Sequence, residues 1–89
     1  MSADPIPAPD KPLDLLDVGL FVRAALLANV TAAGREFGVS AAVASARIAQ
    51  LERQLGARLL HRTTRRISLT QDGEIFMARA EALLSAADA

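Results

Sequence analysis

Residues 31–55, TAAGREFGVSAAVASARIAQLERQL, decide the fold of this 89-residue chain. Residues 31–37 predict a short helix whose first amide groups are capped by the Thr31 side chain. Gly38 follows, and glycine is common just past a helix end because it adopts positive φ without strain. Ser40 is then placed to cap a second helix. The stretch therefore predicts two helices joined by a tight turn.

The second helix combines an apolar stripe with an almost bare opposite face. Apolar residues recur at spacings of four, three and four, which places them on one side of a helix: Ala44, Ile48, Leu51 and Leu55. The opposite face carries Ala42, Ala46, Ala49, Gln50 and Arg53. Because its first two turns hold only small side chains, a groove can approach the backbone closely, as the DNA major groove does around a recognition helix.

Composition limits the classes of protein to consider. A chain of this length forms one domain that buries roughly 60–65% of its unfolded surface, so it holds a small core and no deep cavity. There is no Cys and one His, which excludes a disulfide framework or a thiolate metal site. The apolar runs fall well short of the roughly 20 residues that span a bilayer, and residues 1–10 do not resemble a secretory signal. We expect a cytoplasmic, nucleoid-associated protein with no membrane contact.

Charge is unevenly distributed although the net charge is zero. Residues 35–66 contain seven arginines and two glutamates, whereas residues 1–17 and 67–89 are both net acidic. The planar fork of arginine suits phosphates and guanine edges better than lysine does. The segment therefore favours a nucleic-acid partner; the alternative is a solvated surface whose charge the acidic ends neutralise.

The N-terminal third contains a tail and a scaffold helix. Residues 1–12 include four prolines and predict a disordered tail. Asp14 is placed to open a helix over residues 15–28 that is apolar on most sides and is therefore covered on two sides. Asp14 and Asp17 have no evident pocket or partner, and Ser45 has no nearby base. We expect no catalysis.

Residues 58–69 predict a short β-hairpin with residues 63–66 at or near its tip. Beside a helix-turn-helix such a hairpin forms a wing. Three arginines of this segment, Arg62, Arg65 and Arg66, would reach backbone phosphates or a minor groove. The alternative is that Arg65 and Arg66 are charges that protect an exposed strand edge.

The C-terminal residues predict a long helix that follows Thr70 as its N-cap. Its apolar surface exceeds what a three-helix core can cover, and such a helix usually packs against a partner helix. We expect a homodimer through this helix, with contacts from Phe76, Ala80, Leu83, Leu84 and Ala87.

Several short motifs together resemble one family. The landmarks are Phe21-Val22, Thr31-Ala32-Ala33, Phe37-Gly38-Val39-Ser40, Ser45, Ile48, Leu51-Glu52, Leu55-Gly56, Arg62-Thr63-Thr64-Arg65-Arg66, Leu69-Thr70 and Gly73. This pattern resembles the N-terminal winged helix-turn-helix domain of the LysR-type transcriptional regulators, over about residues 13–88. The resemblance implies a recognition helix in the major groove, a flanking wing and a linker helix that pairs two subunits. Family members continue into an effector-binding domain, so a small-molecule effector would bind a domain absent from this chain.

Three positions of the second helix depart from the family pattern. Ala41 and Ala42 stand where the family often has Gln-Pro, and Ala46 where a polar or basic residue is usual. At these positions direct readout is limited to methyl contact with thymine. Gly34 also replaces the usual Ala, which permits a tight helix crossing but lowers helix propensity by up to about 1 kcal/mol.

The sequence therefore predicts a mostly α fold: a three-helix core, a short β-hairpin wing and a long C-terminal linker helix. The divisions are a tail at 1–12, a winged helix-turn-helix at 13–69 and a dimerisation helix at 70–89. The predicted function is sequence-specific binding of double-stranded DNA without cofactor or metal; the alternative is a winged-helix module that binds another protein. The predicted DNA-binding residues are Thr31, Ser40, Ala41, Ala42, Ser45, Ala46, Arg47, Arg53, Arg62, Arg65 and Arg66.

Overall fold

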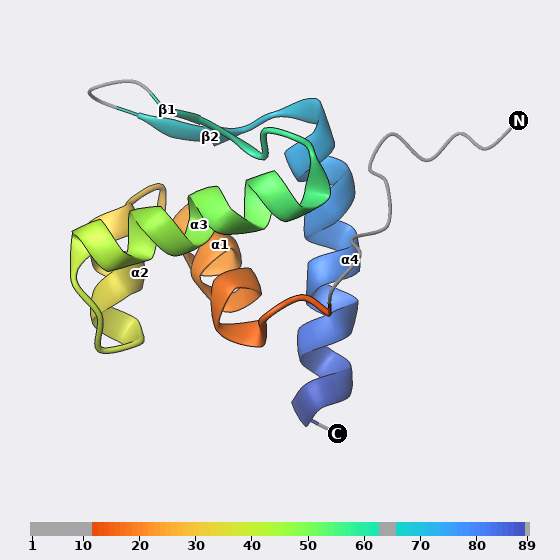
Figure 1. Ribbon diagram of the computed structural model, residues 1–89, viewed down its shortest axis with the longest axis horizontal. Helices are drawn as coiled ribbons and strands as arrows, with labels where there is room; N and C mark the ends of the chain where they lie inside the picture. The colour runs from red at the N-terminus through yellow and green to blue at the C-terminus, as the bar shows by residue number, and fades with distance from the viewer. Residues whose placement is uncertain (1–11, 63–65, 89) are drawn as a thin grey trace, which may run out of the picture.

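The structure is a computed structural model that describes residues 12–62 and 66–88, without the side chains of residues 86–88. These residues form helices and one hairpin in the order α1 (Leu15–Leu27), α2 (Val30–Glu36), α3 (Ala41–Leu55), β1 (Leu60–Arg62), β2 (Ile67–Leu69) and α4 (Gln71–Asp88). The hairpin lies along α3, α2 packs at the N-terminal end of α3, and α4 stands beside this group (Figure 1). The predicted mostly α, winged helix-turn-helix architecture is confirmed.

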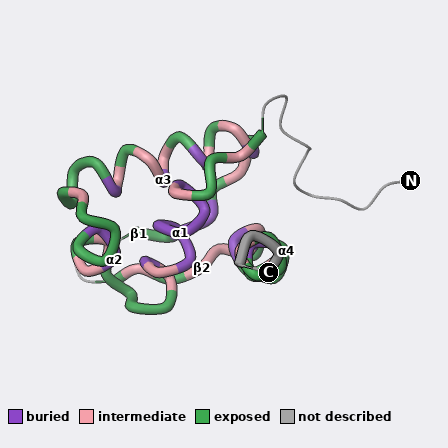
Figure 2. The backbone as a smooth tube through the Cα atoms, turned by 90° about the horizontal axis from the view of Figure 1, so that it is seen from below, coloured by how far each residue is buried: buried purple, intermediate pink, exposed green. Residues whose placement is uncertain are grey.

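Helix α1 forms the centre of the core. Its N-cap is Asp14, whose Oδ1 accepts a hydrogen bond from the Leu16 amide at 2.8 Å, as predicted. Val18, Leu20 and Phe21 are fully buried, and α1 contacts α2, α3 and α4. Figure 2 shows buried positions concentrated along α1 and the inner sides of its neighbours. The helix is the covered scaffold that its apolar composition predicts.

Helix α2 begins earlier than expected. The prediction that Thr31 caps this helix is wrong, because Asn29 is the N-cap and its side chain accepts the Ala32 amide at 3.0 Å. Thr31 instead lies exposed in the first turn. The amide oxygen of Asn is as good a cap as a hydroxyl, so Asn29 takes the position two residues before Thr31.

The turn between α2 and α3 depends on two glycines. Gly38 adopts φ 71°, in the left-handed region that favours glycine, as its place after the helix predicts. A Cβ on Gly34 would lie 2.8 Å from the Val39 carbonyl oxygen and 3.3 Å from Ala44 Cβ. Glycine at position 34 therefore permits the close crossing of the two helices.

Helix α3 has the predicted bounds and orientation. The Ser40 hydroxyl accepts the Val43 amide at 3.1 Å, and Gly56 ends the helix with φ 66°. The predicted apolar stripe is buried: Ala44, Ile48, Leu51 and Leu55. The face with Ala42, Ala46, Gln50 and Arg53 is exposed.

The hairpin joins α3 to α4. Strands β1 and β2 are antiparallel, with Leu60 opposite Leu69 and Arg62 opposite Ile67. Leu60 and the preceding Leu59 are fully buried, so the base of the hairpin belongs to the core. Residues 63–65, including the predicted contact Arg65, lie outside the described residues, as does the predicted N-terminal tail up to residue 11.

Helix α4 begins as predicted, since the Thr70 hydroxyl accepts the Gly73 amide at 2.8 Å. Phe76 packs against Phe21 with ring centroids 5.7 Å apart. Phe76 is 3% exposed and Ala80 0%, so the prediction that these two residues contact a second subunit is wrong; their own chain covers them. The described helices include none that is long and apolar enough to cross a membrane.

The C-terminal half of α4 extends past the core (Figure 1). Leu83 is 43% exposed there, and Leu84 is half-buried against the core. The side chain of Ala87 lies outside the described residues. The apolar stripe that Phe76 and Ala80 begin inside the core thus continues to Leu83, where the chain leaves it uncovered.

Candidate nucleic-acid interface

The exposed face of α3 carries few long side chains. Ala41, Ala42 and Ala46 are all exposed, and Arg53 stands two turns beyond Ala46 on the same side of the helix. This face lies opposite the buried stripe, because α3 turns by 100° at each residue. The N-terminal half of α3 therefore presents backbone and methyl groups to solvent, with a cation only toward its C-terminal end.

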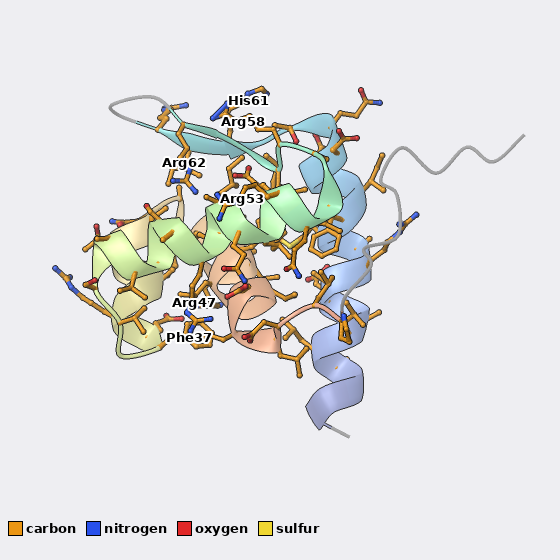
Figure 3. All side chains as sticks on the ribbon, in the orientation of Figure 1. Phe37, Arg47, Arg53, Arg58, His61 and Arg62 are labelled. Atoms are coloured by element: carbon orange, nitrogen blue, oxygen red, sulfur yellow. The ribbon has the colours of Figure 1, made fainter. Side chains whose placement is uncertain are left out.

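One flank of this face is joined to the hairpin. The Arg62 Nη1 of strand β1 donates a hydrogen bond to the Ser45 hydroxyl of α3 at 3.3 Å. Arg62 lies on the hairpin side of α3 (Figure 3). The structure therefore brings together two predicted contacts, Ser45 and Arg62, that are 17 residues apart in sequence.

Glu52 lies on the same flank as Ser45, two helical turns later. Its Oε2 accepts the backbone amides of Leu59 at 2.8 Å and Leu60 at 3.3 Å. Its carbonyl oxygen also accepts the Ala57 amide at 3.1 Å. Glu52 was not among the predicted site residues, because nothing in the sequence indicates which amides a side chain will meet.

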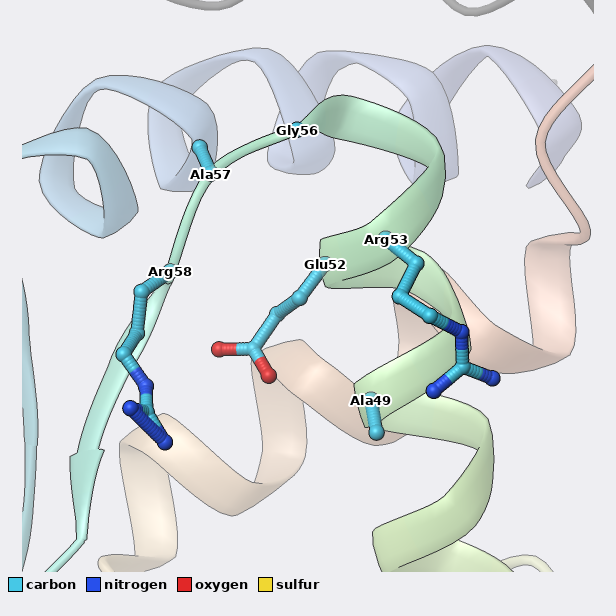
Figure 4. A pocket seen from close by; sticks show the side chains of 6 residues that line it. All are labelled: Ala49, Glu52, Arg53, Gly56, Ala57 and Arg58. Atoms are coloured by element: carbon cyan, nitrogen blue, oxygen red, sulfur yellow. The ribbon is translucent and has the colours of Figure 1, made fainter.

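A shallow hollow opens beside Glu52, between the end of α3 and the segment leading to β1. It has a volume of about 420 Å³ and is lined by Ala49, Glu52, Arg53, Gly56, Ala57 and Arg58. The Glu52 carboxylate lies between the guanidinium groups of Arg53 and Arg58 (Figure 4). Arg58 and the exposed His61 were not among the predicted contacts, although both belong to the basic segment.

The other flank of α3 faces α1 and contains Arg47. Arg47 Nη1 lies 2.9 Å from Asp17 Oδ1 and 3.5 Å from Asp14 Oδ2. The hydrogen bond to Asp17 is the main reason that the Arg47 pKa is raised above its ordinary value. Arg47 lies near Phe37, on the side of α3 away from the hairpin (Figure 3). The ion pairs hold the Arg47 guanidinium toward α1, and the DNA contact by Arg47 stays a prediction.

The remaining predicted positions lie around the start of α3 and on the hairpin. Ser40 is exposed and caps α3, and Thr31 is exposed on α2. Arg66 is exposed immediately before the second hairpin strand. These three polar positions stay predictions as contacts.

An ion pair joins α1 to α2 behind this surface. Arg23 Nε and Nη2 bond the two carboxylate oxygens of Glu36 at 2.6 and 3.1 Å. The hydrogen bond from Arg23 lowers the Glu36 pKa below its ordinary value, and the same bond raises the Arg23 pKa. Within the described part of the chain no three His, Asp or Glu residues are grouped to hold a metal ion.

Comparison with known proteins gives one consistent result. The model of the bacterial regulatory helix-turn-helix proteins of the lysR family matches residues 15–74. The chain is 44% identical over 70 residues to the HTH-type transcriptional regulator DmlR of Escherichia coli (strain K12), which covers 79% of this chain and 23% of that protein. It is 43% identical over 63 residues to an HTH-type transcriptional regulator of Xanthomonas campestris pv. campestris (strain 8004). This match covers 71% of this chain and 18% of that protein.

Solved structures agree with these relatives. The complex of the BenM DNA-binding domain with catB site 1 DNA matches with a TM-score of 0.79 and 31% identity over 84% of this chain and 83% of that one. The complex of the CbnR DNA-binding domain with DNA matches with a TM-score of 0.80 and 31% identity, over 84% and 86%. The chain spans at most about a quarter of the curated relatives it matches, and these relatives are transcriptional regulators, not enzymes. This chain belongs to the lysR family of bacterial regulatory helix-turn-helix proteins.

Proposed function

We propose that this chain binds double-stranded DNA sequence-specifically as the DNA-binding domain of a transcription regulator, with α3 in the major groove. The observation that carries the proposal is the bare, exposed face of α3, flanked on the hairpin side by Arg62 bonded to Ser45. The solved domains of BenM and CbnR that share this fold are complexes with DNA.

The dimensions of the face suit a groove. The major groove of B-DNA is about 12 Å wide and admits one α-helix. Small side chains at Ala42 and Ala46 let the α3 backbone approach the base edges, and their methyl groups can contact thymine methyl groups. We therefore expect thymines and DNA shape to count for more than guanines in the operator. The ratio of specific to non-specific affinity should be smaller than for a recognition helix that reads bases with Gln or Arg side chains.

Cations on the hairpin side supply the backbone contacts. Arg53, Arg58 and Arg62 all lie along the junction of α3 with the hairpin. Arg65 and Arg66 extend this basic set along the sequence of the wing. Contacts of this kind fix the position of a protein on the duplex without reading sequence.

Two copies pair through the exposed part of α4 in this proposal. Leu83 is a large apolar side chain that the chain itself leaves uncovered, on a helix that extends beyond the core. A two-fold pair would place the two α3 helices about 34 Å apart, one turn of the duplex. The operator would then be an inverted repeat.

The two curated relatives named above are longer proteins, of which this chain spans 23% and 18%. We propose that the whole protein is a cytoplasmic regulator and that its effector binds a separate domain. Neither a cofactor nor a metal ion takes part in DNA binding in this proposal.

The dependence of DNA affinity on salt tests the proposal. Each phosphate neutralised by an arginine contributes about −0.9 to the slope of log K against log salt concentration. Fluorescence anisotropy with genomic DNA fragments should show a steep loss of affinity between about 50 and 200 mM salt, the range over which other DNA-binding proteins lose affinity. Arg62→Ala should flatten the slope by about one unit, whereas Arg79→Ala on α4 should not. Binding to a protein partner through the alanine face, nearly independent of salt and without DNA affinity, would favour the protein-interaction alternative.

A further inference from the structure

Glu52 connects α3 to the hairpin at one end of their contact. Leu59 and Leu60, whose amides it accepts, are both fully buried at the base of β1. The chain between them and α3 contains the left-handed turn at Gly56, and glycine restrains its own backbone less than any other residue. Beyond this turn, the Glu52 carboxylate holds the backbone at the start of β1.

The second end of the contact is the bond between Arg62 and Ser45. From Glu52 back to Ser45, α3 advances about 10.5 Å at roughly 1.5 Å per residue. From Leu59 on to Arg62, an extended strand advances about 10 Å at roughly 3.3 Å per residue. The two lengths match, so β1 runs antiparallel to α3 along one flank and is held at both ends by a polar contact.

The alternation of side chains along β1 relates the position of Arg62 to that of Leu60. Residues two apart in a strand face the same side, so Leu60 and Arg62 both face α3 while His61 faces away. Leu60 is buried and His61 is exposed, while Arg62, although exposed, bonds Ser45 on α3. A shift at the start of β1 would therefore move the Arg62 guanidinium away from Ser45.

The start of β1 is also held on the side that faces α4. The Leu59 carbonyl oxygen accepts the Thr70 amide at 3.0 Å, and the Thr70 hydroxyl also donates to the Arg58 carbonyl oxygen. A Cβ on Gly73 would lie 2.0 Å from that same Leu59 oxygen. Leu59 is thus held between α4 on its carbonyl side and Glu52 on its amide side.

We infer that Glu52 is a positioning residue for DNA binding: it sets the place of the wing along α3, so that Arg62 lies at the edge of the groove that α3 occupies. The inference rests on the proposed function. It assigns to a carboxylate a favourable role in binding a polyanion, although the charge itself repels phosphates. A positioning role and the charge therefore predict opposite effects on DNA affinity when the carboxylate is removed.

Substitutions at Glu52 separate position from charge. Glu52→Ala removes the charge and the acceptor, Glu52→Gln removes the charge and keeps an amide oxygen that can accept, and Glu52→Asp keeps the charge but shortens the side chain. If Glu52 positions the wing, the Ala and Asp substitutions should weaken specific DNA binding roughly tenfold, and the Gln substitution should stay within about twofold of the wild type. If Glu52 acts only through its charge, the Ala and Gln substitutions should both tighten DNA binding and the Asp substitution should have no effect. Glu74→Ala, which removes an exposed carboxylate from α4, is the matched control.

A double-mutant cycle with Arg62 supplies the decisive readout. The factor by which Arg62→Ala weakens binding should be clearly present in the wild-type background and should fall below about twofold when Glu52→Ala or Glu52→Asp is also present. Equal factors in all backgrounds, or tighter binding by Glu52→Ala, would overturn the inference. Circular dichroism at the assay temperature confirms that each variant is folded, and Glu52→Asp keeps the test valid if Glu52→Ala is not. Absence of DNA binding by the wild type would instead overturn the proposed function.

Discussion

Arg47 on α3 is paired with Asp17 on α1 at 2.9 Å, and the Asp17 side chain is fully buried. Its Oδ2 has no hydrogen-bond partner within the described residues. An ionised carboxylate in this position depends on Arg47, because burying a charge without a partner is strongly unfavourable. The pair therefore fixes the contact of the recognition helix with the scaffold helix.

Arg47→Ala should lower the free energy of unfolding, because it leaves the buried Asp17 carboxylate without its ionic partner. The loss should be smaller than for an enclosed pair, because the Arg47 side chain is 37% exposed and its removal admits water to Asp17. Urea unfolding measures the change. Arg35→Ala, an exposed arginine on α2, should remain within about 0.5 kcal/mol of the wild type. Equal stability of both variants would show that Asp17 does not need its partner.

Gly73 and Gly19 should respond differently to alanine. At Gly73 a Cβ would meet the Leu59 carbonyl oxygen at 2.0 Å, a backbone atom that Thr70 holds in place. At Gly19 it would meet the Phe37 ring at 2.8 Å, and that side chain is 39% exposed and can turn aside. Gly73→Ala should therefore lower stability by about 3 kcal/mol or more. In Gly19→Ala the gain in helix propensity, up to about 1 kcal/mol, should offset most of the strain. Thermal unfolding of the two variants gives the comparison, and a Gly73→Ala protein as stable as Gly19→Ala would contradict the packing described at the base of the hairpin.

Local patterns in the sequence predicted most of the fold because short-range chemistry decides it. The caps at Asp14 and Ser40, the glycine turns at Gly38 and Gly56 and the apolar stripe of α3 each depend on neighbours within a few residues. The one misplaced cap arose where two adequate caps, Asn29 and Thr31, stand close together in the sequence.

Contacts between distant residues were not predictable in the same way. The pairing of Asp17 with Arg47 spans 30 residues and that of Arg62 with Ser45 spans 17. Both pairings depend on how the helices and the hairpin pack together, and the spacing of apolar residues in the sequence does not specify that packing. For the same reason the sequence could show that α4 is apolar on one side but could not show that Phe76 and Ala80 are covered by their own chain rather than by a second subunit.

Leu83→Asp should dissociate a dimer formed through α4. The substitution places a charge at the centre of the proposed contact, where it would lose its hydration without a partner. Light scattering over a range of protein concentrations measures the dimer fraction. Ser85→Asp, which introduces the same charge at an exposed position on the opposite side of α4, should leave the dimer intact. An unchanged dimer in Leu83→Asp would place the interface elsewhere.

The ion pair of Arg23 with Glu36 should make a small contribution to stability that depends on pH. Because the Glu36 pKa is lowered in the folded chain, the contribution is present above the ordinary pKa of the carboxyl and is lost as the pH falls through the lowered value. The difference in unfolding free energy between the wild type and Glu36→Gln should therefore be present at neutral pH and disappear in acid. It should also shrink with added salt, as expected for an exposed pair. A difference that stays constant through acid pH would contradict the pairing.

The most direct test of the account is the DNA affinity of Ala46→Glu, measured by anisotropy on a duplex selected by the wild-type chain. Ala46 is exposed at the middle of the bare face of α3 and contributes nothing to the core. If this face enters the major groove, a carboxylate there meets the phosphate-lined groove, and affinity should fall by more than about 100-fold while thermal stability stays unchanged. Ala82→Glu, which adds the same charge at an exposed position on α4, should reduce affinity only slightly. Affinity losses that are equal in the two variants, or negligible in Ala46→Glu, would show that α3 does not bind DNA through this face.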